Sequence, residues 1–310
     1  MQHIYGLMAA QLEQPSLVTI GVFDGVHRGH QHLLSRLVEQ ARADGRLAVV
    51  QTFFPHPDVV LRGLAGRYYL TSPDQKAALL ADLGVDVAVT QAFDDALRQV
   101  RAGDYVDLLL NRLKMRALWV GPDFALGYRR EGDVTYLRQR GADKGFDVHV
   151  VDLLADGGPE AIRSTTIRQA LNDGDVEQAR ALLGRPYAVT GPVVHGDRRG
   201  CLIGFPTANI AVWEQQVVPA NGVYAGWATL DTQRFMAVTN VGVRPTFGGQ
   251  DVTIESHLLD FDDDIYGREL AVTFERRLRP EMKFSGVDAL VAQIRADAAA
   301  GRAYLSAISL

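Results

Sequence analysis

Over its first 150 residues the chain alternates short apolar runs with segments of helical pattern, and this alternation restricts its fold more than any other feature. Five runs have the composition of buried strands: 17–23, 46–54, 85–93, 115–121 and 146–154. Four segments between them have helical spacing or helix-boundary residues: 30–45, 72–84, 102–114 and 133–145. The alternation predicts a doubly wound α/β domain, whose parallel sheet is covered by helices on both faces. Its ligand site is expected beyond the C-terminal ends of the strands.

The rest of the chain follows a different pattern. Residues 164–184 predict two short helices, and residues 286–305 predict a closing helix. Five β-rich runs lie between them, separated by Gly, Pro, Asp and Asn: 187–194, 222–230, 235–242, 252–261 and 269–278. Short strands with such turns predict an antiparallel barrel or sandwich. We place the domain boundary between residues 184 and 185, which gives domains of residues 1–184 and 185–310.

Composition narrows the class of protein. The 310 residues are 47% hydrophobic and 22% charged, which is ordinary for a soluble globular protein. A net charge of −5 argues against a protein that binds nucleic acid by bulk electrostatics. The apolar runs are too short to span a membrane, the N-terminus lacks a signal-peptide pattern, and the single Cys201 excludes an intrachain disulfide. We therefore expect a cytoplasmic protein with neither nucleic-acid nor membrane partners.

The motif GVFDGVHRGH lies where the first predicted strand turns into its helix. Backbone N–H groups at a helix N-terminus bind anions, and Gly21 and Gly29 would let a phosphate or ribose approach closely. His27 and His30 lie three residues apart, so both rings share one helix face. Two imidazoles there suit charge that develops on the α-phosphate of a nucleoside triphosphate as pyrophosphate leaves. The alternative is a glycine turn with solvated histidines, which we expect for His32, and a zinc site would need a third ligand.

Further motifs accompany this one along nearly the whole chain: FFPHP at 53–57, GPDFALGYRREGDVTYL at 121–137, RSTTIRQAL at 163–171, GFPTANI at 204–210 and IESHLLDFDDDIYG at 254–267. Together they resemble the bacterial bifunctional riboflavin kinase/FAD synthetases, within the wider H-x-G-H nucleotidyltransferases. The resemblance implies that the first half transfers AMP from ATP to FMN, giving FAD and pyrophosphate. The second half would transfer the γ-phosphate of ATP to riboflavin, giving FMN. It also implies a nucleotidyltransferase domain followed by a six-stranded Greek-key barrel.

The resemblance assigns roles in the adenylyl-transfer half. His27 and His30 would contact the ATP phosphates as catalytic residues. Residues expected to contact nucleotide or flavin are Gly21, Phe23, Asp24, Gly29, His56, Asp123, Phe124, Ser164, Thr165 and Arg168. Without the family, STTIR reads equally well as a helix cap, and His56, between two prolines, equally well as a structural turn. The chain departs from the family at Arg163, where a serine is usual, and at Leu126, where an aromatic residue is usual.

In the second half, the tight loop GFPTAN supplies Gly204, Thr207 and Asn209 as expected nucleotide contacts. Oxygens from Thr207 and Asn209 suit Mg²⁺ bridged by ATP phosphates, so Mg²⁺ with ATP is the expected cofactor. Taken alone, the sequence Pro-Thr-Ala-Asn favours an ordinary turn, and the family motifs decide for the phosphate site. Glu255 matches the family's general base, and strand alternation puts it on one face with His257. For His257 we expect a solvated strand surface. Cys201 lies where the family commonly has a basic residue.

Two rival functions remain open from the sequence. One is a flavin-binding carrier without catalysis, which would require loss of catalytic residues that are all present. The other is a nucleotidyltransferase with a different acceptor and a non-catalytic, flavin-binding barrel. The combination of Thr207, Asn209 and Glu255 argues against that second rival.

Overall fold

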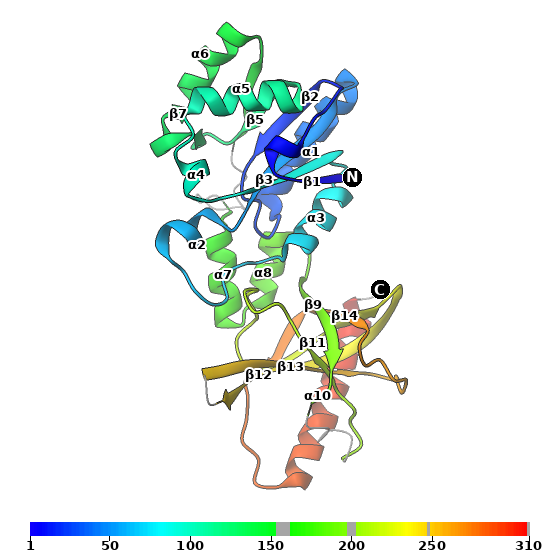
Figure 1. Ribbon diagram of the computed structural model, residues 1–310. Helices are drawn as coiled ribbons and strands as arrows, with labels where there is room; N and C mark the ends of the chain where they lie inside the picture. The colour runs from blue at the N-terminus through cyan, green and yellow to red at the C-terminus, as the bar shows by residue number, and fades with distance from the viewer. Residues whose placement is uncertain (153–161, 197–202, 247–248, 309–310) are drawn as a thin grey trace. The chain divides into compact units, whose positions relative to one another are not determined.

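The computed structural model describes residues 1–152, 162–196, 203–246 and 249–308 (Figure 1). The chain divides into two compact units, Met1–Ser164 and Thr165–Leu310. Helices α7 (Ser164–Asp173) and α8 (Val176–Leu183) therefore belong almost entirely to the second unit. Residues 153–161 and 197–202, including Cys201, lie outside the described part.

The first unit is built on a six-stranded sheet in which every neighbouring pair is parallel. Its spatial order is β1 (Gln2–Tyr5), β4 (Val87–Ala92), β3 (Leu47–Phe54), β2 (Ser16–Ile20), β5 (Met115–Val120) and β8 (Asp147–Val150). The predicted doubly wound domain is confirmed. The sequence pattern missed the edge strand β1, because its residues are not a continuous apolar run.

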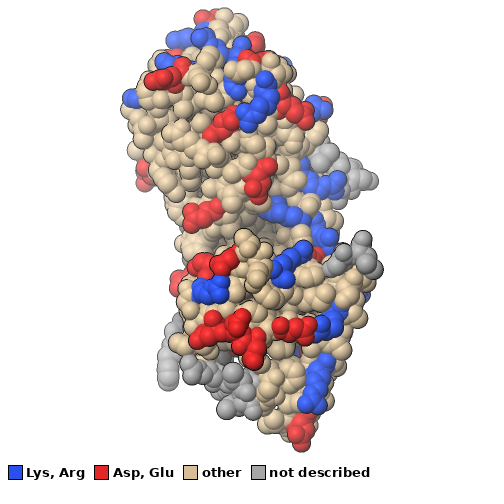
Figure 2. All heavy atoms as spheres, turned by 90° about the vertical axis from the view of Figure 1, so that its right-hand side faces the viewer, with Lys and Arg blue, Asp and Glu red and all other residues tan. Residues whose placement is uncertain are grey.

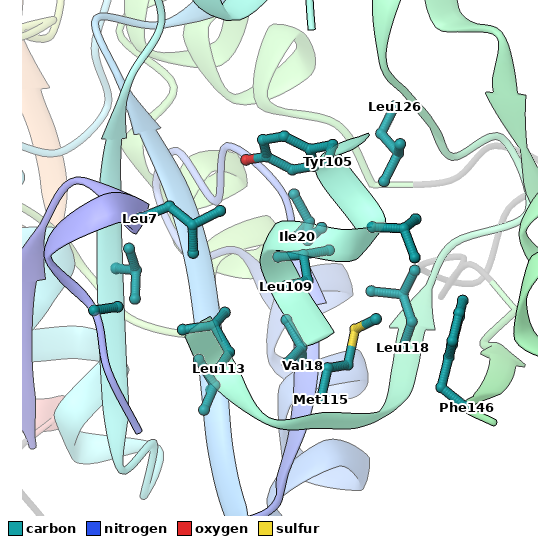
Figure 3. Packing of buried hydrophobic residues seen from close by; sticks show 14 of the residues in the cluster. Leu7, Val18, Ile20, Tyr105, Leu109, Leu113, Met115, Leu118, Leu126 and Phe146 are labelled. Atoms are coloured by element: carbon teal, nitrogen blue, oxygen red, sulfur yellow. The ribbon is translucent and has the colours of Figure 1, made fainter. Parts of the chain in front are cut away.

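Helices cover both faces of this sheet. They are α1 (Arg28–Asp44), α2 (Pro57–Arg62), α3 (Pro73–Asp82), α4 (Asp95–Arg98), α5 (Ala102–Leu113) and α6 (Val134–Lys144), and a small hairpin joins β6 (Ala125–Leu126) to β7 (Gly132–Asp133). Alternate strand residues face opposite layers: Val18 and Ile20 pack with α5 (Figure 3), whereas Leu17 packs with α1 and α3. Burial on both faces explains why these strands are continuous apolar runs.

The second unit holds an antiparallel barrel. Its strands are β9 (Tyr187–Val194), β10 (Ala208–Ile210), β11 (Gly222–Leu230), β12 (Gln233–Thr246), β13 (Gly249–Leu258), β14 (Glu269–Phe274) and β15 (Arg276–Arg279). Six strands close in the order β12-β13-β10-β9-β14-β11, because β11 also pairs with β12, and β15 adds to β11. Helix α10 (Val287–Ile308) packs on β11 and β12. The barrel is confirmed over the sandwich. Strand β10 was not predicted, and the run 269–278 is two strands rather than one.

The surface shown in Figure 2 mixes Lys and Arg with Asp and Glu, and neither sign dominates that face. This matches the modest net charge of −5. Among the described residues, no helix combines the length and the apolar character needed to cross a bilayer.

Candidate active sites

The first candidate site lies where the strand order of the parallel sheet reverses. From β2 the chain proceeds to β3 and β4 on one side, then returns to β5 on the other side of β2. Ligands of doubly wound sheets bind at this switch point, beyond the strands' C-terminal ends. The glycine and histidine motif follows β2 there, as predicted.

The turn after β2 has an unusual backbone. Phe23, Gly25 and Val26 have φ angles of +51°, +78° and +40°, a left-handed region that non-glycine residues rarely adopt. The carboxylate of Asp24 accepts hydrogen bonds from the backbone N–H groups of Leu70 (3.0 and 3.1 Å) and Thr71 (3.3 Å). Asp24, predicted as a nucleotide contact, is thus buried and clamps the turn to the segment before α3.

His27 and His30 come together at the start of α1. His27 is the N-cap: its Nδ1 accepts the N–H of His30 at 3.3 Å, so a neutral His27 carries its ring proton on Nε2. The two rings stack with centroids 3.6 Å apart. Burial, His27 and Lys76 lower the pKa of His30 well below 6.5, so His30 is neutral at physiological pH. Its buried Nδ1 has no hydrogen-bond partner among the described residues.

The two motif glycines make room for rings of the chain itself. A Cβ at Gly21 would lie 3.0 Å from the ring of Phe23, and one at Gly29 would lie 3.2 Å from the ring of His27. Phe23 in turn contacts His30 edge-on, with centroids 5.1 Å apart. The glycines therefore set the positions of the stacked histidines, whatever they also do for a ligand.

Other predicted residues of this half are placed as follows. The hydroxyl of Ser164, the last residue of the first unit, donates to the backbone carbonyl of Asp24 at 3.0 Å. Thr165 and Arg168 follow on α7, where Arg168 is buried. Arg163 directly precedes this helix. Ser164 therefore contacts the turn, and the grip of the second motif on phosphates stays a prediction.

The remaining predicted contacts have structural partners as well. His56 caps α2, its Nδ1 accepting the N–H of Asp58 at 3.0 Å, and its buried ring packs edge-on against Tyr68. Asp123 and Phe124 follow β5 at the switch point; Asp123 is exposed, and Phe124 packs partly into the core. Leu126, which departs from the family pattern, is buried in the same core.

The second candidate site is a pair of cavities in the barrel unit. A cavity of about 310 Å³, here the Glu255 cavity, has mostly apolar walls from β12, the 282–284 segment and α10. Its polar wall residues include Thr207, Asn240, Glu255, His257 and Glu281. A cavity of about 250 Å³, here the Asp262 cavity, is lined by Ser256, Asp262, Asp263, Asp264 and Tyr266 among others. Thr207 lines both cavities.

Strand register explains how the predicted residues meet. Asn209 on β10 pairs directly with Glu255 on β13. Thr207 and Asn209 are two residues apart, which places them on the same side of the chain. The expected tight loop is wrong for Asn209, which lies in strand β10, while Gly204 lies in the turn before it with φ +83°. Gly196 lies against the Asn209 amide, since a Cβ there would come within 2.4 Å of it.

His257 is half-buried and has specific contacts. It lines the Glu255 cavity, and its Nδ1 is 2.8 Å from the carbonyl oxygen of Pro206. Its ring also meets Phe205 edge-on, with centroids 5.6 Å apart. His257 therefore fixes the segment that leads into Thr207. The alternation that put it beside Glu255 is confirmed, because both residues line one cavity.

Comparisons with known proteins agree with this arrangement. Residues 9–166 match the FAD synthetase family model, and residues 183–305 match the riboflavin kinase family model. The bifunctional riboflavin kinase/FMN adenylyltransferase of Escherichia coli (strain K12) is 39% identical over 294 residues, 94% of this chain and 93% of the relative. The protein of the same name from Pseudomonas fluorescens is 39% identical over 306 residues, 98% of this chain and 97% of the relative. This chain belongs to the bifunctional riboflavin kinase/FMN adenylyltransferase family.

A solved structure supports the fold of the whole chain. It is the crystal structure of a protein from Streptococcus pneumoniae that carries the name macrolide-efflux protein. It has a TM-score of 0.89 and 30% identity, and the match covers 97% of this chain and 99% of that one. The efflux name belongs to the pneumococcal protein alone, and the two chains have their fold in common.

Sequence reasoning missed three buried charged groups among the described residues: Lys76, Asp297 and Glu275. Lys76 on α3 is only 8% exposed, and Asp297 on α10 is only 6% exposed. A signal for Lys76 was present: it lies three and four residues before Leu79 and Leu80, on the apolar face of its helix. Asp297 pairs with Arg279, and both line the Glu255 cavity.

Proposed function

We propose that residues 185–310 phosphorylate riboflavin with ATP, giving FMN, and that residues 1–184 adenylylate FMN with a second ATP, giving FAD and pyrophosphate. The observation that carries the proposal is that each unit has a candidate active site of its own. The first unit has the stacked histidines at the switch point of its sheet. The second has Glu255 in a largely apolar cavity, and Thr207 lines both this cavity and a second one. The partners are therefore small molecules: ATP, riboflavin, FMN and FAD. Because both reactions consume ATP, we also propose a cytoplasmic location.

For adenylyl transfer, a phosphate oxygen of FMN attacks the α-phosphorus of ATP, and the bond to the pyrophosphate oxygen breaks. Negative charge then gathers on the α-phosphate oxygens and on the leaving pyrophosphate. The His27 ring is oriented to donate from Nε2, because its Nδ1 is engaged by the backbone. The neutral His30 ring, stacked on it, supplies a second donor without the cost of a buried charge.

The other motif residues would bind the nucleotide around these rings. The N–H groups at the start of α1 favour anions, and Gly21, Phe23, Asp24 and Gly29 shape the turn that precedes it. Ser164, Thr165 and Arg168 would hold the β- and γ-phosphates, with Arg168 as the cation. Asp123, Phe124 and His56, at the ends of β5 and β3, are proposed contacts of adenosine or flavin.

For phosphorylation, the apolar walls of the Glu255 cavity suit the flavin ring, and the Asp262 cavity would hold the nucleotide. Transfer would then occur near Thr207, the residue common to both. Glu255 is proposed as the general base, which accepts the proton of riboflavin's primary hydroxyl as that oxygen attacks the γ-phosphorus. Gly204 allows the turn that leads into this segment.

Thr207 and Asn209 are the residues that would hold Mg²⁺. Their side chains offer a hydroxyl and an amide oxygen, the hard ligands that Mg²⁺ accepts alongside water and phosphate oxygens. The close approach of Gly196 leaves space for the Asn209 amide. The ion would neutralise charge on the ATP phosphates.

The direct test is to incubate the protein with riboflavin, ATP and Mg²⁺ and to separate the flavin products. The proposal predicts FMN followed by FAD. Unchanged riboflavin would indicate a carrier. Failure to convert either riboflavin or supplied FMN, with AMP transfer to another acceptor, would indicate the rival nucleotidyltransferase.

Variants assign the kinase chemistry. Glu255→Gln is expected to lower FMN formation by about 10²–10⁴, the usual span for a positioned acid–base group. FAD formation from supplied FMN should persist, and riboflavin binding should change little, because glutamine keeps the shape. Glu269→Gln on β14 is the matched control, since Glu269 is exposed and lies outside both cavities. A loss below tenfold would remove Glu255 from the role of base.

A further inference from the structure

A lysine is buried beside the turn that carries the stacked histidines. Lys76 lies in the first turn of α3, a helix fixed by a capping box between Ser72 and Gln75. Its side chain is 8% exposed, although lysine is almost never fully buried unless its charge is paired. The adenylyl-transfer mechanism described above makes no use of this amine.

The contacts of Lys76 are to the ends of two neighbouring strands. Its Nζ donates to the carbonyl oxygen of Val22 at 3.1 Å, to Oγ1 of Thr52 at 3.0 Å and to the carbonyl oxygen of Phe53 at 3.4 Å. An ammonium group has three N–H donors, so these acceptors use all of them. Val22 follows β2 in the histidine turn, and Thr52 and Phe53 end β3. Thr52 also donates to the carbonyl of Val22 at 2.8 Å, which closes a small network.

The amine acts electrostatically on the same turn. None of its three acceptors is a carboxylate, so the charge is held by dipoles. Asp24 is the acidic group that favours its charged form, while burial lowers the pKa of Lys76 to about 8. The other titratable groups coupled to it are His30 and His3, whose pKa values it lowers. Lys76 thereby contributes to keeping His30 neutral.

We propose that Lys76 is a positioning residue for adenylyl transfer, whose charged amine holds the 21–26 turn against the end of β3 and so sets the places of His27 and His30. This rests on the proposed function of the first unit. Lys76 does not need to touch the nucleotide. It acts through Val22, which lies between Gly21 and Phe23. The ring of Phe23 packs against Gly21 and contacts the ring of His30.

The test compares Lys76→Met with Lys144→Met, which removes a partly exposed lysine of α6 in the same unit. Lys76→Met is expected to lower kcat/KM for FMN adenylylation by about 10–100-fold, the loss typical when catalytic groups shift by an ångström. Riboflavin phosphorylation by the same protein should not change, and Lys144→Met should change neither activity. Normal adenylylation by Lys76→Met would overturn the proposal.

The pH profile separates charge from mere packing. If the charged amine is required, wild-type kcat/KM for adenylylation falls as the pH rises through about 8, because kcat/KM reports groups of the free enzyme. In Lys76→Arg, whose side chain stays charged, kcat/KM for adenylylation should no longer decrease as the pH rises. Lys76→Met should show no such decrease either, because its activity is already low. A wild-type profile that is flat through that range would overturn the proposal.

Thr52→Val keeps the test open if Lys76→Met does not fold. It removes one acceptor of Lys76 and one anchor of Val22, so adenylylation should fall, while Thr52→Ser should retain it. Equal activity of the two variants would count against the network. If the wild-type protein itself made no FAD, the proposed function would fail rather than this inference.

Discussion

The ion pair between Asp297 and Arg279 offers the sharpest test of how the barrel unit builds the Glu255 cavity, the proposed flavin site. The carboxylate of Asp297 on α10 accepts hydrogen bonds from Nε (3.0 Å) and Nη2 (2.8 Å) of Arg279 on β15. It accepts a third from the side-chain amide of Gln293 at 2.8 Å. The two side chains of the pair are 7% and 15% exposed. Both residues line the Glu255 cavity, so the pair joins two of its walls. We predict that Asp297→Asn weakens this unit and its riboflavin binding together.

The size of the effect follows from burial. Removing one partner of a buried ion pair costs about 3–5 kcal/mol, because it leaves an uncompensated charge. Asparagine keeps one acceptor oxygen for Arg279, so we expect the free energy of unfolding to fall by about 2–3 kcal/mol. For a unit of this size that corresponds to a loss of roughly 6–10 °C in Tm. A shift of α10 in the cavity wall should also weaken riboflavin binding on the order of tenfold.

Asp260→Asn is the matched control. Asp260 forms an Arg–Asp pair with Arg302 of the same helix at 2.7 Å, but the two side chains are 73% and 48% exposed. Surface pairs contribute little, so the control should match wild type. Calorimetry of the barrel transition and a riboflavin titration measure both quantities. The reasoning is refuted if the Asp297→Asn and Asp260→Asn proteins have the same Tm and the same affinity for riboflavin.

Three further outcomes are expected. His27→Ala should lower FAD formation from FMN by about 10²–10³ and spare riboflavin phosphorylation, with His32→Ala as the control; equal loss of both activities would contradict the assignment. Gly29→Ala should also lower FAD formation selectively, because the new methyl lies 3.2 Å from the His27 ring; a fully active variant would refute that packing role. A fragment of residues 185–310 should fold and phosphorylate riboflavin. A fragment of residues 165–310 should be more stable, because only the longer one keeps Arg180, which pairs with the buried Glu275 at 2.8 Å. Calorimetry of the two fragments checks this.

The sequence predicts well what depends on local pattern. Continuous apolar runs identified the strands buried on both faces, and the glycines and histidines after β2 identified the switch-point site. It predicts poorly what depends on distant contacts. Lys76 reaches acceptors 54 and 24 residues away, and His257 reaches a carbonyl 51 residues away. Strand β10, only three residues long, is specified by its partners β9 and β13 rather than by its own composition.

The buried amine of Lys76 also links pH to stability, in the direction opposite to its expected effect on activity. Its pKa falls from 10.5 in the unfolded chain to about 8 in the folded one. Between these values the unfolded chain binds more protons, so the folding stability of the first unit rises with pH. Below pH 8 the amine is charged in both states, and the full burial penalty is present. Across the window the gain amounts to about 3 kcal/mol, at 1.36 kcal/mol for each pKa unit.

Activity and stability should therefore separate above pH 8. The measured quantity is the difference in unfolding free energy between wild type and Lys76→Met at each pH, because contributions that the two proteins share cancel in it. We expect that difference to move in favour of wild type as the pH rises from about 8 toward 10.5, while wild-type adenylylation declines. If activity fell because the unit unfolded, both quantities would fall together. Because a neutral amine costs less to bury but can no longer saturate three acceptors, the fold gains stability from the same deprotonation that releases the histidine turn.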